Sequence, residues 1–250
     1  MDYKRVSYKR YDVMTELPIA TVTKRKDLSH ELMLLWLLPE TPFTFKPGQY
    51  CTIRLENFER AYSIVSGPHE PALELFVELV PDGPVTTKLW NLREGDRVSI
   101  HPRANGIFLM DKKYTNHFMV STVTAVAPFV SIIRSYFHSS EKRRHFYILQ
   151  GASYQGEFGY REELENLATA NPDFITYIPT ISRPQEETNA GWVGVTGRVN
   201  NIVEEYLDKF GLSSESTMLY ACGHPGMIED VKVRASLRGF TVTEERFWKQ

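Results

Sequence analysis

The chain has 250 residues and a formal net charge of −2, and 42% of its residues are hydrophobic against 24% charged. This composition is typical of a soluble globular protein with one large domain or two ordinary ones, and the near-neutral charge argues against nucleic-acid binding through bulk positive charge. The two cysteines are too few for a four-cysteine iron–sulfur cluster or a disulfide framework, so redox chemistry would need an organic cofactor or a partner.

The first residues and the length of the apolar runs bear on the compartment. Residues 1–16 contain basic residues and tyrosines but lack the apolar core of a secretory signal, so we predict a loosely ordered N-terminal extension. No run approaches the roughly 18 consecutive apolar residues that a membrane-spanning helix needs. We therefore expect a cytoplasmic protein that is monomeric, has no membrane span and holds no metal.

Residues 17–112 show the alternation that is typical of β-strands. Apolar residues recur at every second position, as at Leu73, Leu75 and Val77, and turns rich in Gly and Pro separate the apolar segments. One short helix is predicted, from Val85 to Leu92. Short strands at this spacing predict a closed or nearly closed antiparallel β-barrel.

Residues 113–250 change to a rhythm of strand followed by helix. Apolar strands are predicted at residues 118–121, 145–149 and 218–222, and a helical pattern follows each of them. This alternation predicts an α/β domain in which helices cover both faces of a parallel sheet. Ligands of such domains bind at the carboxyl ends of the strands.

Three side chains on one predicted strand suit a ligand that has both a pyrophosphate and a flat ring. Arg60 offers a guanidinium fork, Tyr62 an aromatic plane and Ser63 a hydroxyl. The run Arg60-x-Tyr62-Ser63 resembles the flavin-binding signature of the ferredoxin–NADP(+) reductase family. Gly83 and Thr86, at the start of the predicted short helix, resemble the second flavin motif of that family. The resemblance implies FAD, with Arg60 and Thr86 on its pyrophosphate.

A second set of residues resembles the nicotinamide-dinucleotide turn of the same family. Thr122, Thr124 and Pro128 match the family pattern, whereas Val123 stands in the position of its central glycine. A β-branched valine does not readily adopt a positive φ or allow the close approach of a backbone. Either the backbone is regular there, or the dinucleotide binds less closely.

Two arginines and a Cys-Gly motif extend this resemblance. Arg183 and Arg198 match family arginines that bind the 2′-phosphate of NADP, a dianion that suits guanidinium groups. Ser153 stands where bacterial members carry a further arginine. Cys222 and Gly223 match a Cys-Gly-x-Pro motif that the family places beside the nicotinamide ring. Together these matches favour NADP over NAD.

The C-terminal residues resemble the aromatic tail of bacterial members. This resemblance implies that Phe247 covers the isoalloxazine ring of FAD and that Trp248 lies on the adenine side. It also implies that Ser63 forms a hydrogen bond near flavin N5 and that Cys222 shapes the place where nicotinamide meets the flavin. Glu245 is a further candidate, for proton exchange.

The sequence is identified as a member of the bacterial-type ferredoxin or flavodoxin–NADP(+) reductases, over nearly the whole chain from about residue 17. The implied activity is electron transfer between NADP(H) and ferredoxin or flavodoxin through FAD. Two alternatives stay open. Ser153 motivates an NADH-dependent reductase that serves an oxygenase, a cytochrome or a quinone. Val123 motivates a flavin-binding regulatory or structural subunit without nicotinamide activity.

Overall fold

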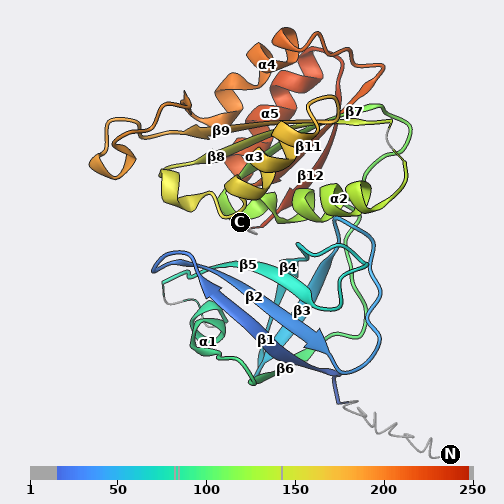
Figure 1. Ribbon diagram of the computed structural model, residues 1–250, viewed down its shortest axis with the longest axis vertical. Coiled ribbons are helices and arrows are strands. Elements are labelled where there is room, and N and C mark those ends of the chain that lie inside the picture. The colour runs from blue at the N-terminus through green and yellow to red at the C-terminus, as the bar shows by residue number, and fades with distance from the viewer. Residues whose placement is uncertain (1–15, 82, 84, 142, 248–250) are drawn as a thin grey trace, which may run out of the picture.

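The computed structural model describes residues 16–81, 83, 85–141 and 143–247, and it contains two six-stranded sheets (Figure 1). The first sheet is formed by β1 (Ile19–Asp27), β2 (Leu32–Pro39), β3 (Tyr50–Leu55), β4 (Phe58–Ser63), β5 (Leu73–Glu78) and β6 (Arg97–Ile100), and α1 (Thr86–Asn91) connects β5 to β6. We call this part the barrel domain.

The second sheet follows in the chain and is accompanied by longer helices. Its strands are β7 (Asn116–Thr122), β8 (His145–Ala152), β9 (Ile175–Ile181), β10 (Val195–Thr196), β11 (Thr217–Gly223) and β12 (Thr241–Arg246). Its helices are α2 (Ala127–His138), α3 (Arg161–Ala170), α4 (Val203–Lys209) and α5 (Pro225–Leu237). We call this part the sheet domain.

The strand pairs of the barrel domain are antiparallel, in the order β4-β3-β6-β1-β2-β5. The two outer strands approach each other, because Ile64 and Leu75 form an isolated bridge and the amide of Val65 donates to the carbonyl of Glu74 at 2.8 Å. The sheet is therefore curled into a nearly closed barrel, as the alternating sequence predicts. Its apolar interior includes Cys51, and burial raises the pKa of that thiol to about 12.

The strands of the sheet domain are parallel, in the order β10-β9-β8-β7-β11-β12. Figure 1 shows α2 and α3 on the side that faces the barrel domain, and α4 and α5 on the opposite side. One apolar cluster lies beneath each helical layer. The direction of the strand order changes beside β7, so the switch point at which such sheets bind ligands lies between β7 and β11.

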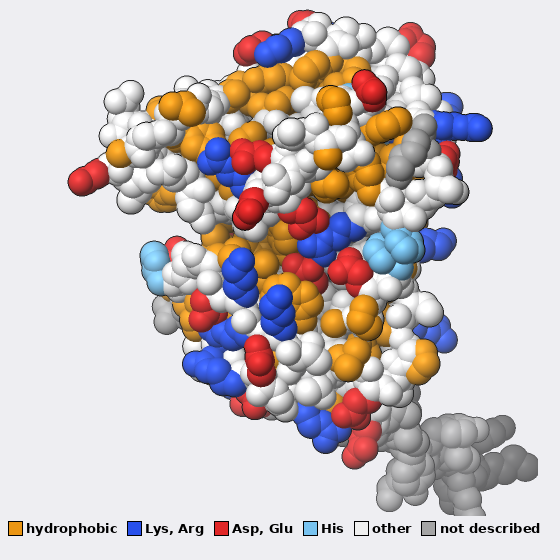
Figure 2. All heavy atoms as spheres, in the orientation of Figure 1, with side chains coloured by type: hydrophobic (Ala, Val, Ile, Leu, Met, Phe, Trp, Pro, Cys, Tyr) orange, Lys and Arg blue, Asp and Glu red, His pale blue; other side chains and the backbone are white. Residues whose placement is uncertain are grey.

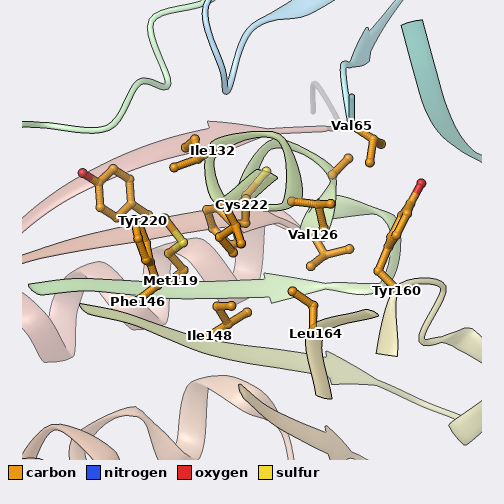
Figure 3. Close-up of a cluster of buried hydrophobic side chains, with 14 of the residues drawn as sticks. Val65, Met119, Val126, Ile132, Phe146, Ile148, Tyr160, Leu164, Tyr220 and Cys222 are labelled. Carbon is orange, nitrogen blue, oxygen red and sulfur yellow. The ribbon is translucent and has the colours of Figure 1, made fainter. Parts of the chain in front are cut away.

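The apolar cluster beneath α2 and α3 continues into the barrel domain. It includes Leu34, Val65 and Phe76 from the barrel. Figure 3 shows Val65 on the same side of the second sheet as Val126 and Cys222. The two domains therefore share one apolar core, which holds them against each other.

One barrel strand, β5, is buried on both faces. Alternation alone places Glu74 and Phe76 on the outer face of this strand, away from the barrel interior. Nevertheless, Glu74 is only 3% exposed and Phe76 only 4%. The reason is that Tyr160 and Arg134 of the sheet domain contact this outer face. The second face of β5 is thus part of the domain interface.

The predicted helices are confirmed, with small shifts at their ends. The predicted helix from Val85 to Leu92 is α1, one residue shorter at each end. Before α4, the chain forms a 3-10 turn over Val199–Ile202, which continues directly into the helix. Among the residues that the structure describes, no helix is both long and apolar enough to cross a membrane.

Candidate active site

Ser63, Cys222 and Glu245, which come from separate motifs, meet at the boundary between the domains. Ser63 ends β4, and its Oγ donates a hydrogen bond to Glu245 Oε2 at 3.2 Å. Cys222 and Glu245 are direct neighbours in the pairing of β11 with β12. One strand end of the barrel and two strand ends of the second sheet therefore form one site.

The protonation of this site is set by burial. Desolvation raises the pKa of Glu245 from 4.5 to about 7, although the hydrogen bond from Ser63 opposes the rise. Burial, and then the negative charge of Glu245, raise the pKa of the Cys222 thiol well above its ordinary value. Cys222 is therefore a neutral thiol rather than a nucleophilic thiolate, whereas Glu245 can exchange a proton near neutral pH.

The other two residues of the first flavin motif lie on the same strand as Ser63. Arg60 is exposed and pairs with Ile53 across β3, and Tyr62 pairs with Cys51. Two residues that are two positions apart point to the same face of a strand. Burial raises the pKa of Tyr62, so its phenol stays neutral. The strand therefore presents an exposed cation and a partly buried aromatic ring on the same face.

The turn before α1 is so tightly packed that position 83 has no room for a side chain. A Cβ atom at Gly83 would lie 2.5 Å from Thr86 Oγ1 and 3.0 Å from the carbonyl oxygen of Val80, so only glycine fits. Thr86 Oγ1 donates to that same carbonyl at 3.1 Å. At the N-cap, Val85 offers no side-chain acceptor to the first amides of α1. One of these amides, that of Thr87, already donates to the carbonyl of Gly83 at 3.1 Å, so the start of α1 offers fewer free amides to a phosphate.

In the sheet domain, the residues of the dinucleotide turn lie at the switch point. Thr122 ends β7, and its Oγ1 accepts a hydrogen bond from the amide of His224 at 3.4 Å. Gly223 has a φ of +128°, and a Cβ atom there would overlap Thr122 Oγ1. Thr124 is buried in the connecting turn, and Pro128 lies in the first turn of α2. The ends of β7 and β11 are thus in direct contact.

Val123 has a φ of +43°, the left-handed conformation that usually requires glycine. Of the two alternatives for this residue, a regular backbone is therefore wrong. The Val123 carbonyl oxygen accepts a hydrogen bond from Gln150 Nε2 at 3.1 Å. The turn keeps the conformation of a glycine although it carries a branched side chain.

Arg183 and Arg198 lie at one edge of the sheet. Ile181 pairs with Thr196 in register, and each arginine follows its strand by two residues. Both are exposed, and Arg183 Nη1 donates to Tyr154 OH at 2.6 Å. The two guanidinium groups thus follow adjacent strand ends.

Ser153, Phe247 and Trp248 are the remaining residues that the sequence places at the site. The amide of Ser153 donates to Glu157 Oε2 at 2.7 Å, so the 152–157 turn is closed by this carboxylate. Phe247 is partly buried and packs against the core that the two domains share. Trp248 lies outside the described residues.

A buried charge network between the domains has no counterpart among the residues predicted from the sequence. Arg134 of α2 donates to Glu74 Oε2 at 2.5 Å and to the two oxygens of Glu163 at 2.7 and 2.8 Å. Tyr160 donates to the other oxygen of Glu74 at 2.8 Å. Burial opposes the charge of Arg134, but Glu163 and Glu74 outweigh it and raise its pKa. Figure 2 shows basic and acidic side chains side by side at this boundary.

Two family models match the chain. Residues 19–105 match an oxidoreductase FAD-binding domain, and residues 119–233 match an oxidoreductase NAD-binding domain. The chain belongs to the ferredoxin reductase-like flavoprotein family. In this flavoprotein, the barrel domain is the FAD-binding domain and the sheet domain is the NAD-binding domain.

Relatives of this flavoprotein include reductases with different partners. It is 29% identical over 230 residues to the flavodoxin/ferredoxin–NADP reductase of Escherichia coli strain K12. This match covers 88% of this chain and 90% of the relative. It is 26% identical over 211 residues to the ferredoxin–NAD(P)(+) reductase component of the naphthalene 1,2-dioxygenase system of Pseudomonas putida, over 84% of this chain and 61% of the relative.

A solved structure supports the fold. It is that of a ferredoxin NADP+ reductase from Neisseria gonorrhoeae with bound FAD and NADP. It matches with a TM-score of 0.82 at 21% identity, over 94% of this chain and 100% of that one.

Proposed function

We propose that this flavoprotein transfers electrons between NADP(H) and ferredoxin or flavodoxin in the cytoplasm. The observation that carries the proposal is the meeting of Ser63, from the FAD-binding domain, with Cys222 and Glu245, from the NAD-binding domain. A site between two cofactor domains can bring the reactive ends of both cofactors together. FAD supplies the required chemistry when bound, because it exchanges hydride with nicotinamide and single electrons with a protein partner.

The barrel domain offers groups that fit FAD. The exposed guanidinium of Arg60 and the start of α1 would hold the pyrophosphate, and Gly83 belongs to the turn that leads into this helix. Tyr62 would contact one side of the flavin ring. Phe247 would cover the other side, and it would have to move aside for nicotinamide to stack.

The three residues at the domain boundary take different roles. Glu245, with its pKa of about 7, would hold or release a proton near neutral pH, and the hydroxyl of Ser63 would relay it toward the flavin. Cys222 is fully buried and neutral, so it would shape the site and exclude water.

The choice of NADP rests on Arg183 and Arg198. Their positions after paired strand ends would let two guanidinium groups bind the 2′-phosphate with charge-assisted hydrogen bonds. NAD lacks this phosphate. Arg198→Ala should therefore raise the KM for NADPH by about tenfold and leave the KM for NADH within about twofold, because a charge-assisted hydrogen bond contributes about 1.5–3 kcal/mol.

The partner would be recognised by charge. Figure 2 shows Lys and Arg side chains gathered on the left of the barrel domain, and the exposed Lys24 and Lys26 belong to β1 of this domain. Basic side chains attract an acidic electron carrier and raise its rate of association, an effect that salt weakens.

Coupled reduction tests the proposed function. NADPH and oxidised ferredoxin or flavodoxin are mixed with and without the purified flavoprotein, and reduction of the carrier is followed by its absorbance. The proposal predicts reduction that depends on the protein and slows as salt is raised. Oxidation of NADPH without reduction of either carrier would contradict the partner assignment.

Ser153 favours a second candidate, an NADH-dependent reductase that serves an oxygenase. The position offers a hydroxyl rather than a positive charge toward a 2′-phosphate. The Pseudomonas putida relative is named as a ferredoxin–NAD(P)(+) reductase component of a dioxygenase system. The ratio of kcat/KM for NADPH and NADH separates the candidates, and a strong preference for NADH would support the second.

A further inference from the structure

Val123 occupies a conformation that its side chain disfavours. Its φ of +43° lies in the left-handed region, where a β-branched residue is a genuine outlier. Such a conformation persists only when the surrounding structure holds it. The residue lies between the end of β7 and the first turn of α2, at the switch point of the sheet.

Two side chains from the neighbouring strands hold this turn. Gln150 of β8 is fully buried, and its Nε2 donates to the carbonyl oxygen of Val123 at 3.1 Å. The other atom of the amide, Oε1, accepts a hydrogen bond from Tyr177 OH of β9 at 2.7 Å. The second bond fixes the orientation of the Gln150 amide, so the two bonds form one chain from β9 through β8 to Val123.

Packing supports the same conformation. The partly buried side chain of Val123 contacts the core shared by the domains and also a small cluster of Ala152, Phe158 and Ile181. Phe158 in turn stacks on Trp192, with ring centroids 5.6 Å apart. The isopropyl group therefore fills a position between two apolar clusters.

We propose that Gln150, oriented by Tyr177, is a positioning residue that holds Val123 in its left-handed conformation and so shapes the turn that receives the phosphates of the nicotinamide dinucleotide. The inference deepens the proposed function and rests on it. Main-chain amides at such a turn bind phosphates only when their direction is fixed. Glycine would adopt this conformation without help, whereas valine requires the two hydrogen bonds.

A double-mutant cycle tests the clamp, which is the name used here for the hydrogen-bonded chain from Tyr177 through Gln150 to the carbonyl of Val123. Dissociation constants for NADP+ are measured by calorimetry on four FAD-loaded proteins: wild type, Gln150→Leu, Val123→Gly and the double variant. Gln150→Leu should weaken NADP+ binding by about tenfold, the effect of losing one well-formed hydrogen bond. In the Val123→Gly background the same change should alter binding by less than about twofold. Tyr177→Phe should weaken binding by about threefold.

A matched control separates the clamp from general damage. Asn171 Nδ2 donates to the carbonyl of Leu167 at 3.1 Å, at the opposite end of the sheet from the turn. Asn171→Leu therefore removes an equivalent bond and should leave NADP+ binding within about twofold. Equal weakening of NADP+ binding by Gln150→Leu in the wild-type and Val123→Gly backgrounds would overturn the inference. Unchanged NADP+ binding when Gln150→Leu is made in the wild-type background would overturn it as well.

Thermal unfolding distinguishes a failed inference from a failed function. If the wild type binds neither NADP+ nor NAD+, the proposed function is wrong, and the clamp is still tested by stability. Gln150→Leu should lower Tm by about 3 °C in the wild-type background and by less than half as much with Val123→Gly. Equal shifts in both backgrounds would show that Gln150 does not hold Val123.

Discussion

Ser63 and Glu245 lie 182 positions apart in the sequence, and their side chains share a hydrogen bond of 3.2 Å across the domain boundary. This bond joins the end of a barrel strand to the last strand of the parallel sheet. Because it links the FAD-binding domain to the NAD-binding domain, it marks the place where the two cofactors are expected to meet.

The first prediction concerns the buried Glu245. Its pKa is raised from 4.5 to about 7 in the folded protein, so the folded state favours the protonated carboxyl. The resulting stability is fully present below pH 4.5 and is lost as the pH rises through 7, up to about 3 kcal/mol. Glu245→Gln stays neutral. Urea unfolding at pH 5 and pH 8 should show the variant gaining about 2–3 kcal/mol relative to the wild type between these values.

Ser63→Ala should move the same transition. The hydrogen bond from Ser63 lowers the pKa of Glu245, so its loss should raise the pKa and extend the decline in stability above pH 7. A difference between wild type and Glu245→Gln that does not change with pH would contradict this account of Glu245.

The second prediction concerns the pair of Arg134 and Glu74. Arg134→Met leaves the buried Glu74 without its cation, which should lower the free energy of unfolding by about 3–5 kcal/mol in urea titrations. Arg97 provides the control, because it pairs with Glu40 at 2.6 Å with side chains 60% and 48% exposed. Arg97→Met should cost no more than about 1 kcal/mol. Similar losses in the free energy of unfolding for the two variants would contradict the conclusion that the buried pair of Arg134 and Glu74 stabilises the domain interface.

The two-domain fold could be predicted from the sequence because its signals are local. Alternation of apolar residues at every second position gives the barrel strands, and the strand–helix rhythm gives the parallel sheet. The family motifs then identify Ser63, Cys222 and Glu245, which the structure brings together.

The domain interface could not be predicted in the same way. Glu74 alternates with interior residues, which says nothing of the second domain that buries its outer face. Its partner Arg134 lies 60 positions away, and no local pattern relates them. Gln150 did carry a signal, because it is a polar residue that follows the apolar run Ile148–Leu149. The one signal for the left-handed backbone of Val123 was the glycine that the family carries at this position, since valine itself rarely adopts this conformation.

The third prediction concerns His117, a fully buried residue at the start of β7 whose Nδ1 lies 3.1 Å from Tyr220 OH. Burial, with a smaller effect of Arg144, lowers its pKa from 6.5 to about 4. A lowered pKa gives stability that is present above pH 6.5 and is lost as the pH falls through 4. Phenylalanine cannot be protonated. Between pH 7 and pH 4, the free energy of unfolding of His117→Phe should therefore fall by about 3 kcal/mol less than that of the wild type.

The measurement is urea unfolding of both proteins across that pH range. At pH 7 the variant should be about 1 kcal/mol less stable, because it lacks the hydrogen bond with Tyr220. Parallel losses of stability on acidification would show that His117 is not the group that titrates.

The fourth prediction concerns Arg60. Arg60→Ala removes the exposed guanidinium from the flavin motif, so the purified protein should contain far less FAD, measured as the ratio of flavin to protein absorbance. Arg54→Ala is the matched control, because Arg54 lies on the neighbouring strand and pairs with Glu59. The control should keep its FAD. Full occupancy in Arg60→Ala would exclude Arg60 as a pyrophosphate ligand.

Anaerobic mixing of the purified yellow protein with NADPH tests the central claim most directly, because it needs both cofactor sites and no partner. If Ser63, Cys222 and Glu245 mark the place where the two cofactors meet, NADPH should bleach the flavin absorbance, and it should do so at lower concentrations than NADH. Flavin absorbance that neither NADPH nor NADH changes would contradict the account.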